Sequence, residues 1–252
     1  MVQVGVPVEQ LNARDFRYAL DNLFDNFRTA SSDMCGRFTL ATPAPDLQLA
    51  FNLDEVPPLY VPRYNIAPTQ PVAVITSDYP NHLDFMRWGL VPSWAKDISI
   101  GSKLINARGE TLMEKPSFRT AAKRRRCLIP ADGFYEWDRG EKPSQPYYVQ
   151  VNDGQPFAMA GLWEIWESSE GDLLKSCTII TTEANSVLSK IHDRMPVILP
   201  KEHWYDWLRG YDQDLLVPYD AGQMSMIPVS KRVNSPVLDE AALREKISLS
   251  DR

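Results

Sequence analysis

The sequence predicts a single α+β domain built around a curled, mostly antiparallel β-sheet with a barrel-like core and short flanking helices. Strand-like and helix-like segments follow one another without the β-α-β regularity of a parallel sheet, which favours this class. The 20 prolines outnumber the 12 glycines, which indicates many ordered connections. The 252 residues suffice for one large domain or two small ones, and no linker is evident after Asp33.

Residues 1–33 differ from the rest of the chain, so we expect the domain to span residues 34–252. Between Asn12 and Phe27, phenylalanine and leucine residues recur at helical spacing, which predicts a short amphipathic helix. The small, polar segment from Thr29 to Asp33 is typical of a linker. Two explanations stay open: translation starts at Met34, or the first 33 residues form a leader that is cleaved.

The elements of the domain are predicted from apolar periodicity and from the positions of turn residues. In chain order, strands are predicted at Arg37–Leu40, Val72–Thr76, Leu83–Trp88 (a hairpin with the preceding strand), Cys127–Pro130, Tyr147–Val151, Phe157–Trp166, Cys177–Thr182 and Met226–Ser230. Helices are predicted at Asp46–Phe51, from about Gly109 into a basic run, at Ala184–Lys190, at His203–Leu208 and, weakly, at Asp239–Ile247.

Composition excludes several classes of protein. No stretch of about 18 apolar residues is present, and the N-terminus lacks the charged and apolar regions of a secretory signal. Three cysteines without a CxxC pair argue against a disulfide framework and fit a reducing cytoplasm. The three histidines and the cysteines are scattered without ligand spacing, so we expect no metal.

The charge is unevenly distributed along the chain. The net charge of −6 argues against a broadly basic coat for nucleic acid. Between Lys103 and Arg126, however, the sequence contains eight basic residues and only two acidic ones, Glu110 and Glu114, which gives a local net charge of +6. A solvated helix face is the simpler interpretation of this run, and a local phosphate-binding patch is the sharper one.

Cys35, in the stretch Met34-Cys35-Gly36-Arg37-Phe38, is distinctive if Met34 is the true start and is removed. The cysteine then carries a free α-amine, with a pKa of about 7.7–8.0, beside its thiol. Such an amine attacks an aldehyde to form a Schiff base, and the thiol closes onto the imine carbon as a thiazolidine ring. The alternative is an ordinary small, buried residue before a strand.

Two further residues are candidates for proton transfer. Glu136 lies between Tyr135 and Trp137, where desolvation would raise the pKa of its carboxyl, although a solvent-facing strand glutamate is an equal alternative. His192 stands beside Asp193 and suits proton shuttling or phosphate binding. For His192 taken alone, a loop histidine whose hydrogen bonds are made within the protein is the simpler interpretation.

Several polar and aromatic residues are candidates for binding. Asn106 and Arg108 alternate with apolar neighbours, so both can face one cleft, where the amide would orient an amine and the guanidinium a phosphate. Asn65 precedes a preformed loop containing Pro68. Trp94 suits either a core position or a stacking surface for an exposed base.

The order of these motifs carries more information than any one of them. From Met34 to about Ser230 the chain contains MCGRF, RYNIAPTQ, WGLVPSW, LINARGET, a basic helix, GFYEW and IHDRMP. In this order the motifs resemble the SOS-response-associated peptidase (SRAP) family, the abasic-site processing proteins. The resemblance does not cover residues 1–33.

The resemblance implies a protein that binds single-stranded DNA and crosslinks covalently to the aldehyde of an abasic site. It implies catalytic roles for the nucleophile Cys35, for Asn106 in orienting the amine and sugar, for Glu136 as general acid/base, and for His192 at the Schiff base. It also implies a DNA channel lined by Arg37, Asn65, Pro68, Trp94, Arg108 and Arg194. Two departures matter: the residues ahead of Cys35 block its amine, and Ala95 stands where some members have a second tryptophan.

Three functions therefore stay open. The first is a cofactor-free, monomeric trap for abasic sites, acting in the cytoplasm and at the nucleoid when DNA is damaged, without a metal or a membrane partner. The second is a cysteine peptidase that removes its own leader and so exposes Cys35. The third is a non-covalent reader of modified DNA. An abasic-site lyase side reaction follows from the same Schiff base.

Overall fold

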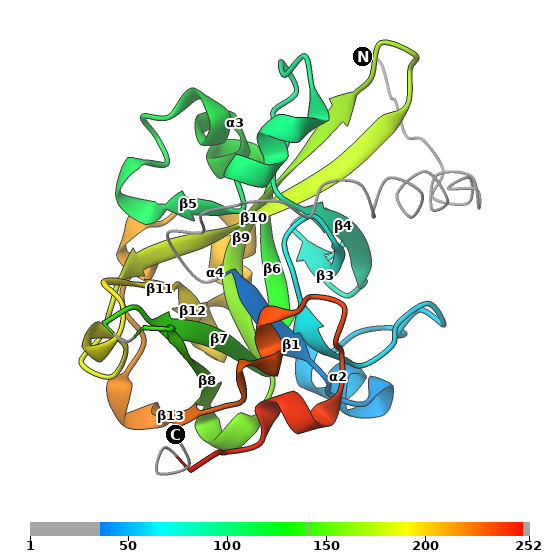
Figure 1. Ribbon diagram of the computed structural model, residues 1–252. Coiled ribbons are helices and arrows are strands. Elements are labelled where there is room, and N and C mark those ends of the chain that lie inside the picture. The colour runs from blue at the N-terminus through cyan, green and yellow to red at the C-terminus, as the bar shows by residue number, and fades with distance from the viewer. Residues whose placement is uncertain (1–35, 141, 249–252) are drawn as a thin grey trace. The chain divides into compact units, whose positions relative to one another are not determined.

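The computed structural model describes residues 36–140 and 142–248 (Figure 1). The chain divides into two units, Met1–Ser31 and Ser32–Arg252, and all described residues belong to the second. The helix predicted at Asn12–Phe27, the predicted linker and Cys35 lie outside the described residues.

Five strands of the larger sheet close into a ring. They are β3 (Pro71–Thr76), β4 (Asp84–Trp88), β6 (Arg126–Ala131), β9 (Phe157–Glu167) and β10 (Leu173–Glu183). Around the ring, β4 pairs β3, β3 pairs β6, β6 pairs β9 and β9 pairs β10, all antiparallel. A parallel contact of β10 with β4, which sets Cys177 opposite Trp88, completes it. Closure leaves these strands without a free edge along the ring.

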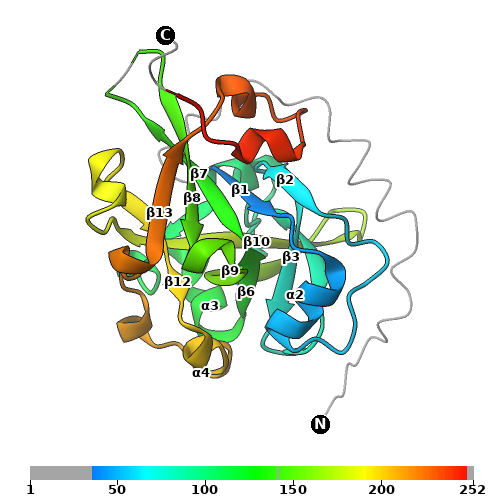
Figure 2. The same ribbon diagram turned by 90° about the horizontal axis from the view of Figure 1, so that it is seen from below.

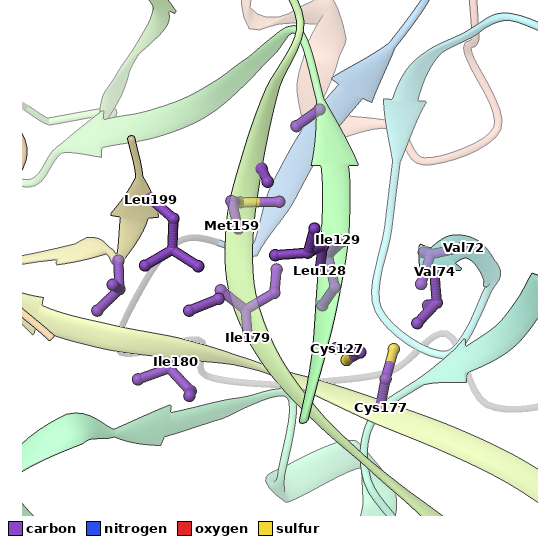
Figure 3. Packing of buried hydrophobic residues seen from close by; sticks show 14 of the residues in the cluster. Val72, Val74, Cys127, Leu128, Ile129, Met159, Cys177, Ile179, Ile180 and Leu199 are labelled. Carbon is purple, nitrogen blue, oxygen red and sulfur yellow. The ribbon is translucent and has the colours of Figure 1, made fainter. Parts of the chain in front are cut away.

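The interior of the ring is filled by apolar side chains. Figure 3 shows Ile129, Met159 and Ile179 gathered between β6, β9 and β10. Cys127 and Cys177 are fully buried free thiols in the same cluster. Burial raises the pKa of both thiols, which keeps them in the unreactive neutral form.

A second, five-stranded sheet lies beside the ring and is antiparallel throughout (Figure 2). Its order is β13 (Met224–Pro228), β8 (Gln145–Val151), β7 (Gly133–Asp138), β1 (Arg37–Leu40) and β2 (Arg63–Ile66). Only Asp132 separates β6 from β7, so one nearly continuous segment joins the two sheets. Gly133 permits this passage, because a Cβ there would stand 2.2 Å from the Tyr148 hydroxyl.

Three short strands attach to the rim of the ring. β5 (Asn106–Arg108) runs parallel to β10, and β11 (Arg194–Pro196) pairs with it antiparallel. β12 (Ile198–Leu199) pairs with β9. The segments that contain LINARGET and IHDRMP are thus brought to one strand, although β5 and β11 are more than 80 residues apart in the sequence.

The α-helices are short: α2 (Ala44–Phe51), α3 (Pro116–Arg124) and α4 (Trp204–Arg209). Short 3-10 helices lie between and after the strands, at Ile98–Lys103, Gly109–Thr111, Asn152–Gly154, Leu188–Lys190, Lys201–His203, Gln213–Leu215, Ala221–Gln223, Lys231–Asn234 and Ala241–Arg244. Among the described helices, none combines the length and the apolar character needed to cross a bilayer.

This architecture confirms the predicted α+β class with a mostly antiparallel, barrel-like sheet. Three helix predictions were wrong in extent. Ala184–Lys190 contains only the turn Leu188–Lys190, because the Asn185 side chain binds the N–H groups of Val187 and Leu188 and holds a turn there. The helix expected from about Gly109 begins only at Pro116, and Asp239–Ile247 contains only one turn.

Candidate functional site

Glu136 on β7 is the most unusual carboxyl group in the described part of the chain. Its residue is only 2% exposed, and its Oε2 atom has no hydrogen-bond partner among the described residues. Its Oε1 atom accepts the backbone N–H of Trp137 at 3.1 Å. Burial raises the pKa of Glu136 from 4.5 to about 7, against a smaller lowering by that hydrogen bond and by Arg139. The carboxyl is thus poised to gain or lose a proton near neutral pH.

Glu164 on β9 is a second buried glutamate, with a different set of partners. It is 4% exposed and, in the same way, accepts the N–H of the next residue, Ile165, at 2.9 Å. It also pairs with Arg125, with 2.7 Å between Oε1 and Nη1. Two glutamates with similar burial and the same local hydrogen bond therefore differ in their partners, because Glu164 has a close arginine.

His192 and Asp193 lie in the segment that directly precedes β11. The charge of Asp193 contributes to the raised pKa of Glu136, so the carboxylates lie within electrostatic reach of one another. The His192 side chain is nearly buried, whereas that of Asp193 is 85% exposed. The segment that contains His192 is thus within electrostatic reach of Glu136 through Asp193.

The Nδ1 atom of His192 has two polar neighbours. Its Nδ1 atom accepts the backbone N–H of Arg194 at 3.0 Å and lies 3.1 Å from the Asp193 carboxylate. The imidazole is therefore coupled to a carboxylate that also acts on Glu136.

Asn106 and Arg108 lie on β5, opposite Ile179 and Thr181 of β10. Because side chains alternate along a strand, the two residues share one face while Ala107 is buried on the other. Asn106 is half-buried and Arg108 is exposed. This alternation agrees with the predicted common face.

Arg194 on β11 makes contacts on two sides. Its Nη1 and Nη2 atoms bind the two carboxylate oxygens of Glu110 at 2.6 and 2.8 Å. Nη2 also donates to the backbone carbonyl of Thr181 at 2.8 Å. The guanidinium is therefore fixed on β10, close to β5.

Arg37 and Asn65 hold the C-terminal segment against β1 and β2. Arg37 donates from Nη1 to the Asn65 side-chain oxygen and to the carbonyl of Val233, both at 2.8 Å. Asn65 is fully buried and donates from Nδ2 to the carbonyls of Ser235 and Leu238 at 3.0 and 2.6 Å. Burial lowers the pKa of Arg37 to about 10, so it keeps its charge at neutral pH. With no exposed surface, Asn65 serves here to position its neighbours.

Pro68 and Trp94 lie in two loops. Pro68 is half-buried in a turn in which the N–H of Gln70 binds the carbonyl of Ala67, and Thr69 adopts φ 71°. Trp94 is 58% exposed, so the stacking interpretation is sterically open to it and the core interpretation is excluded.

The basic run divides between structure and surface. Arg126 is buried and donates to the carbonyls of Ala122, Trp207 and Leu208. Arg125 pairs with Glu164, whereas Lys123 and Arg124 are exposed in the last turn of α3. Neither a solvated helix face nor a phosphate-binding patch therefore describes all four residues of the KRRR run.

Two residues near the site were not singled out from the sequence. Glu110 entered only as a negative charge within the basic run, and Asp193 only as a neighbour of His192. Their neighbours in the sequence are those of ordinary surface carboxylates. They were missed because the residues on which they act are distant in the sequence. Among the described residues, no cluster of three or more His, Cys, Asp or Glu could hold a metal ion.

Residues 34–236 match the family described as SOS response associated peptidase (SRAP). The chain belongs to this family. The SRAP match begins at Met34, next to Cys35, and includes every residue predicted here to act in catalysis or binding.

Named relatives and a solved structure agree with the SRAP assignment. The chain is 49% identical over 213 residues to abasic site processing protein YoqW of Bacillus subtilis, covering 81% of this chain and 95% of that protein. It is 36% identical over 226 residues to abasic site processing protein HMCES of Rattus norvegicus, covering 71% and 63%. A crystal structure of a protein from Bacteroides thetaiotaomicron superposes with a TM-score of 0.76 and 26% identity, covering 85% of this chain and all of that one.

Proposed function

We propose that this SRAP protein acts in the DNA-damage response by capturing abasic sites in single-stranded DNA as a covalent thiazolidine on Cys35. The relatives named as abasic site processing proteins support the lesion as its target. The strand preference and the covalent step rest on the chemistry of the residues.

The observation that carries the proposal is the buried, desolvated Glu136 beside the start of β1. Arg37 pairs with Tyr135 in the β1–β7 register, so Glu136 comes directly after the partner of Arg37. Cys35 is two residues before Arg37 in the sequence. The proposal therefore assigns the proton transfers of the Cys35 reaction to a carboxyl whose pKa of about 7 suits them.

The other two cysteines do not compete for this role. Cys127 and Cys177 are fully buried, with the pKa of each thiol raised by desolvation. Neither of them can acquire an α-amine by removal of a start methionine. Among the three cysteines of the chain, Cys35 alone combines both functions.

The proposed reaction proceeds in two bond-forming steps. The α-amine of Cys35 attacks the aldehyde carbon of the ring-opened sugar, and loss of one water gives an imine. The thiol then adds to the imine carbon and its proton passes to the nitrogen, which closes the thiazolidine. Glu136 donates and accepts the protons of sugar opening and water loss, Asn106 orients the amine and the sugar hydroxyl, and His192 stabilises the imine.

DNA binding is assigned to the face around β5 and β11. Arg108 and Arg194 would contact phosphates, and the exposed Trp94 would stack on a base or wedge at the lesion. Arg37, Asn65 and Pro68 would shape the channel by holding β1, β2 and the loop after β2. Since the overall charge is −6, binding to undamaged DNA should be modest and salt-sensitive.

A free amine requires that Cys35 be the first residue of the reactive form. If residues 1–34 are synthesised, hydrolysis of the Met34–Cys35 peptide bond releases them and consumes one water. The family description as a peptidase supports self-cleavage at this site as a second activity. An imine that escapes the thiol can undergo β-elimination, which would be observed as lyase activity.

The test is the intact mass of the protein before and after incubation with a single-stranded oligonucleotide that contains one abasic site. We expect a chain beginning at Cys35 that gains the oligonucleotide mass less one water and survives denaturation. An undamaged oligonucleotide of the same sequence should give no adduct, and Cys35→Ala should abolish it. Binding that Cys35→Ala leaves unchanged, without any denaturant-resistant complex, would instead favour a non-covalent reader.

A further inference from the structure

Glu110 occupies the outward-facing side of Arg194. The carboxylate binds both Nη atoms, at 2.6 and 2.8 Å, in the bidentate geometry that a guanidinium also offers to a phosphate. The Arg194 side chain is 12% exposed and that of Glu110 is 53% exposed. Of the two partners, the carboxylate is thus the one that faces solvent.

The turn that holds Glu110 is pressed against β10. Gly109 precedes Glu110, and a Cβ at Gly109 would stand 3.3 Å from Leu216 and 3.4 Å from the carbonyl of Thr181. This close approach brings Glu110 to the strand that also anchors Arg194. The Arg194 hydrogen bond lowers the pKa of Glu110, with a smaller contribution from Arg108, so the carboxylate is ionised at neutral pH. Glu110 therefore acts on both arginines proposed to contact phosphate.

Arg194 has a second anchor that does not depend on Glu110. Its Nη2 atom donates to the Thr181 carbonyl at 2.8 Å, and its Nε atom is buried without an acceptor among the described residues. If the Glu110 side chain turned into solvent, the guanidinium would stay at β10 with its outer edge open.

We propose that Glu110 is an anionic placeholder, whose carboxylate occupies on Arg194 the position of a DNA phosphate and is displaced when nucleic acid binds. This inference rests on the proposed function. Its consequence is selectivity: each DNA strand must displace a carboxylate before Arg194 contributes, which weakens binding to strands that offer no further contact. The exposed carboxylate regains water when it leaves, so the competition is modest in size.

Glu110→Gln tests the placeholder, and Glu114→Gln is its matched control. Glu114 is an exposed carboxylate in the same segment and forms no ion pair among the described residues, yet its substitution changes the net charge equally. Affinity for an undamaged single-stranded oligonucleotide is measured by fluorescence anisotropy over a range of salt concentrations. Glu110→Gln should bind up to about fivefold more tightly than the parent, which is the upper range for an exposed ion pair. Because Arg194 reaches the phosphate in both complexes, the log–log slope against salt should stay close to that of the parent.

The gain in affinity from Glu110→Gln should exceed the gain from Glu114→Gln. In an Arg194→Gln background, adding Glu110→Gln should give no further gain over adding Glu114→Gln. Equal gains from the two glutamines, or weaker binding by Glu110→Gln, would overturn the placeholder. Crosslinking to the abasic oligonucleotide is measured on the same samples. If the parent crosslinks but Glu110→Gln binds DNA no more tightly than Glu114→Gln, only the placeholder is refuted. If Glu110→Gln binds more tightly than its control but the parent forms no crosslink, only the covalent trap is refuted.

Discussion

The buried carboxyl of Glu136 should make the stability of this protein fall as the pH rises through neutrality. Its pKa of about 7 in the folded protein exceeds the ordinary value of 4.5. Between these values the folded chain holds a proton that the unfolded chain has lost, so the free energy of unfolding decreases with rising pH. One pKa unit corresponds to about 1.4 kcal/mol, so the full effect is roughly 3 kcal/mol, complete above about pH 7.

Glu136→Gln removes this titration and should therefore be stabilising at pH 8. The amide oxygen can still accept the Trp137 N–H, whereas the new NH₂ group has no described acceptor at the position of Oε2. That unsatisfied group costs about 1–3 kcal/mol, so the variant should equal or fall below the parent at pH 5. At pH 8 its stability relative to the parent should be higher by roughly 2.5 kcal/mol than at pH 5, because a part of the titration lies below pH 5.

Urea unfolding at pH 5 and pH 8, followed by tryptophan fluorescence, measures both values. Glu164→Gln is the control, because it removes a similarly buried carboxylate that is paired with Arg125 at 2.7 Å. That substitution leaves a cation without its partner and should destabilise the protein at pH 8. The reasoning fails if Glu136→Gln changes the unfolding free energy by the same amount at both pH values.

Three further substitutions separate structural from functional roles. Asn65→Ala should destabilise the protein by about 2–4 kcal/mol in urea unfolding, because Arg37 and the carbonyls of the C-terminal segment lose their buried partner. Trp94→Ala should change stability by less than about 0.5 kcal/mol but weaken binding to single-stranded DNA by about 1–3 kcal/mol in anisotropy titrations. Asp193→Asn should move the pH midpoint of crosslinking downward, since it removes a charge that raises the pKa of Glu136; because Asp193 is exposed, the displacement should stay below about one pH unit.

Local pattern predicted most of the strands, because alternation and β-branched residues report directly on which side of a sheet is buried. It could not predict the ring, which depends on a parallel contact between β4 and β10, 89 residues apart at Trp88 and Cys177. The helix predicted at Ala184–Lys190 failed for a local reason that propensity does not include, the side-chain hydrogen bonds of Asn185.

The same distinction applies to the site. The sequence left Glu136 equally divided between a buried and a solvent-facing position, and the pairing of β7 between β1 and β8 decided for burial. The KRRR run could not reveal that Arg126 is buried while Lys123 and Arg124 are exposed, because the acceptors of Arg126 include carbonyls of α4 more than 80 residues later. Contacts between distant segments thus determine which charged residues remain for function.

Three carboxylic acids are buried in the described part of the chain, and they are not treated alike. Asp132 accepts hydrogen bonds from Thr39, from Thr42 and from the N–H of Ala41. Glu164 has its arginine, whereas Glu136 receives one backbone N–H and leaves an oxygen without a described partner. Stability alone would favour a neutral or paired residue at that position, as it evidently does at the other two. A carboxyl with a pKa of about 7, held at a cost in stability, suits the proposed proton transfers of sugar opening and water loss.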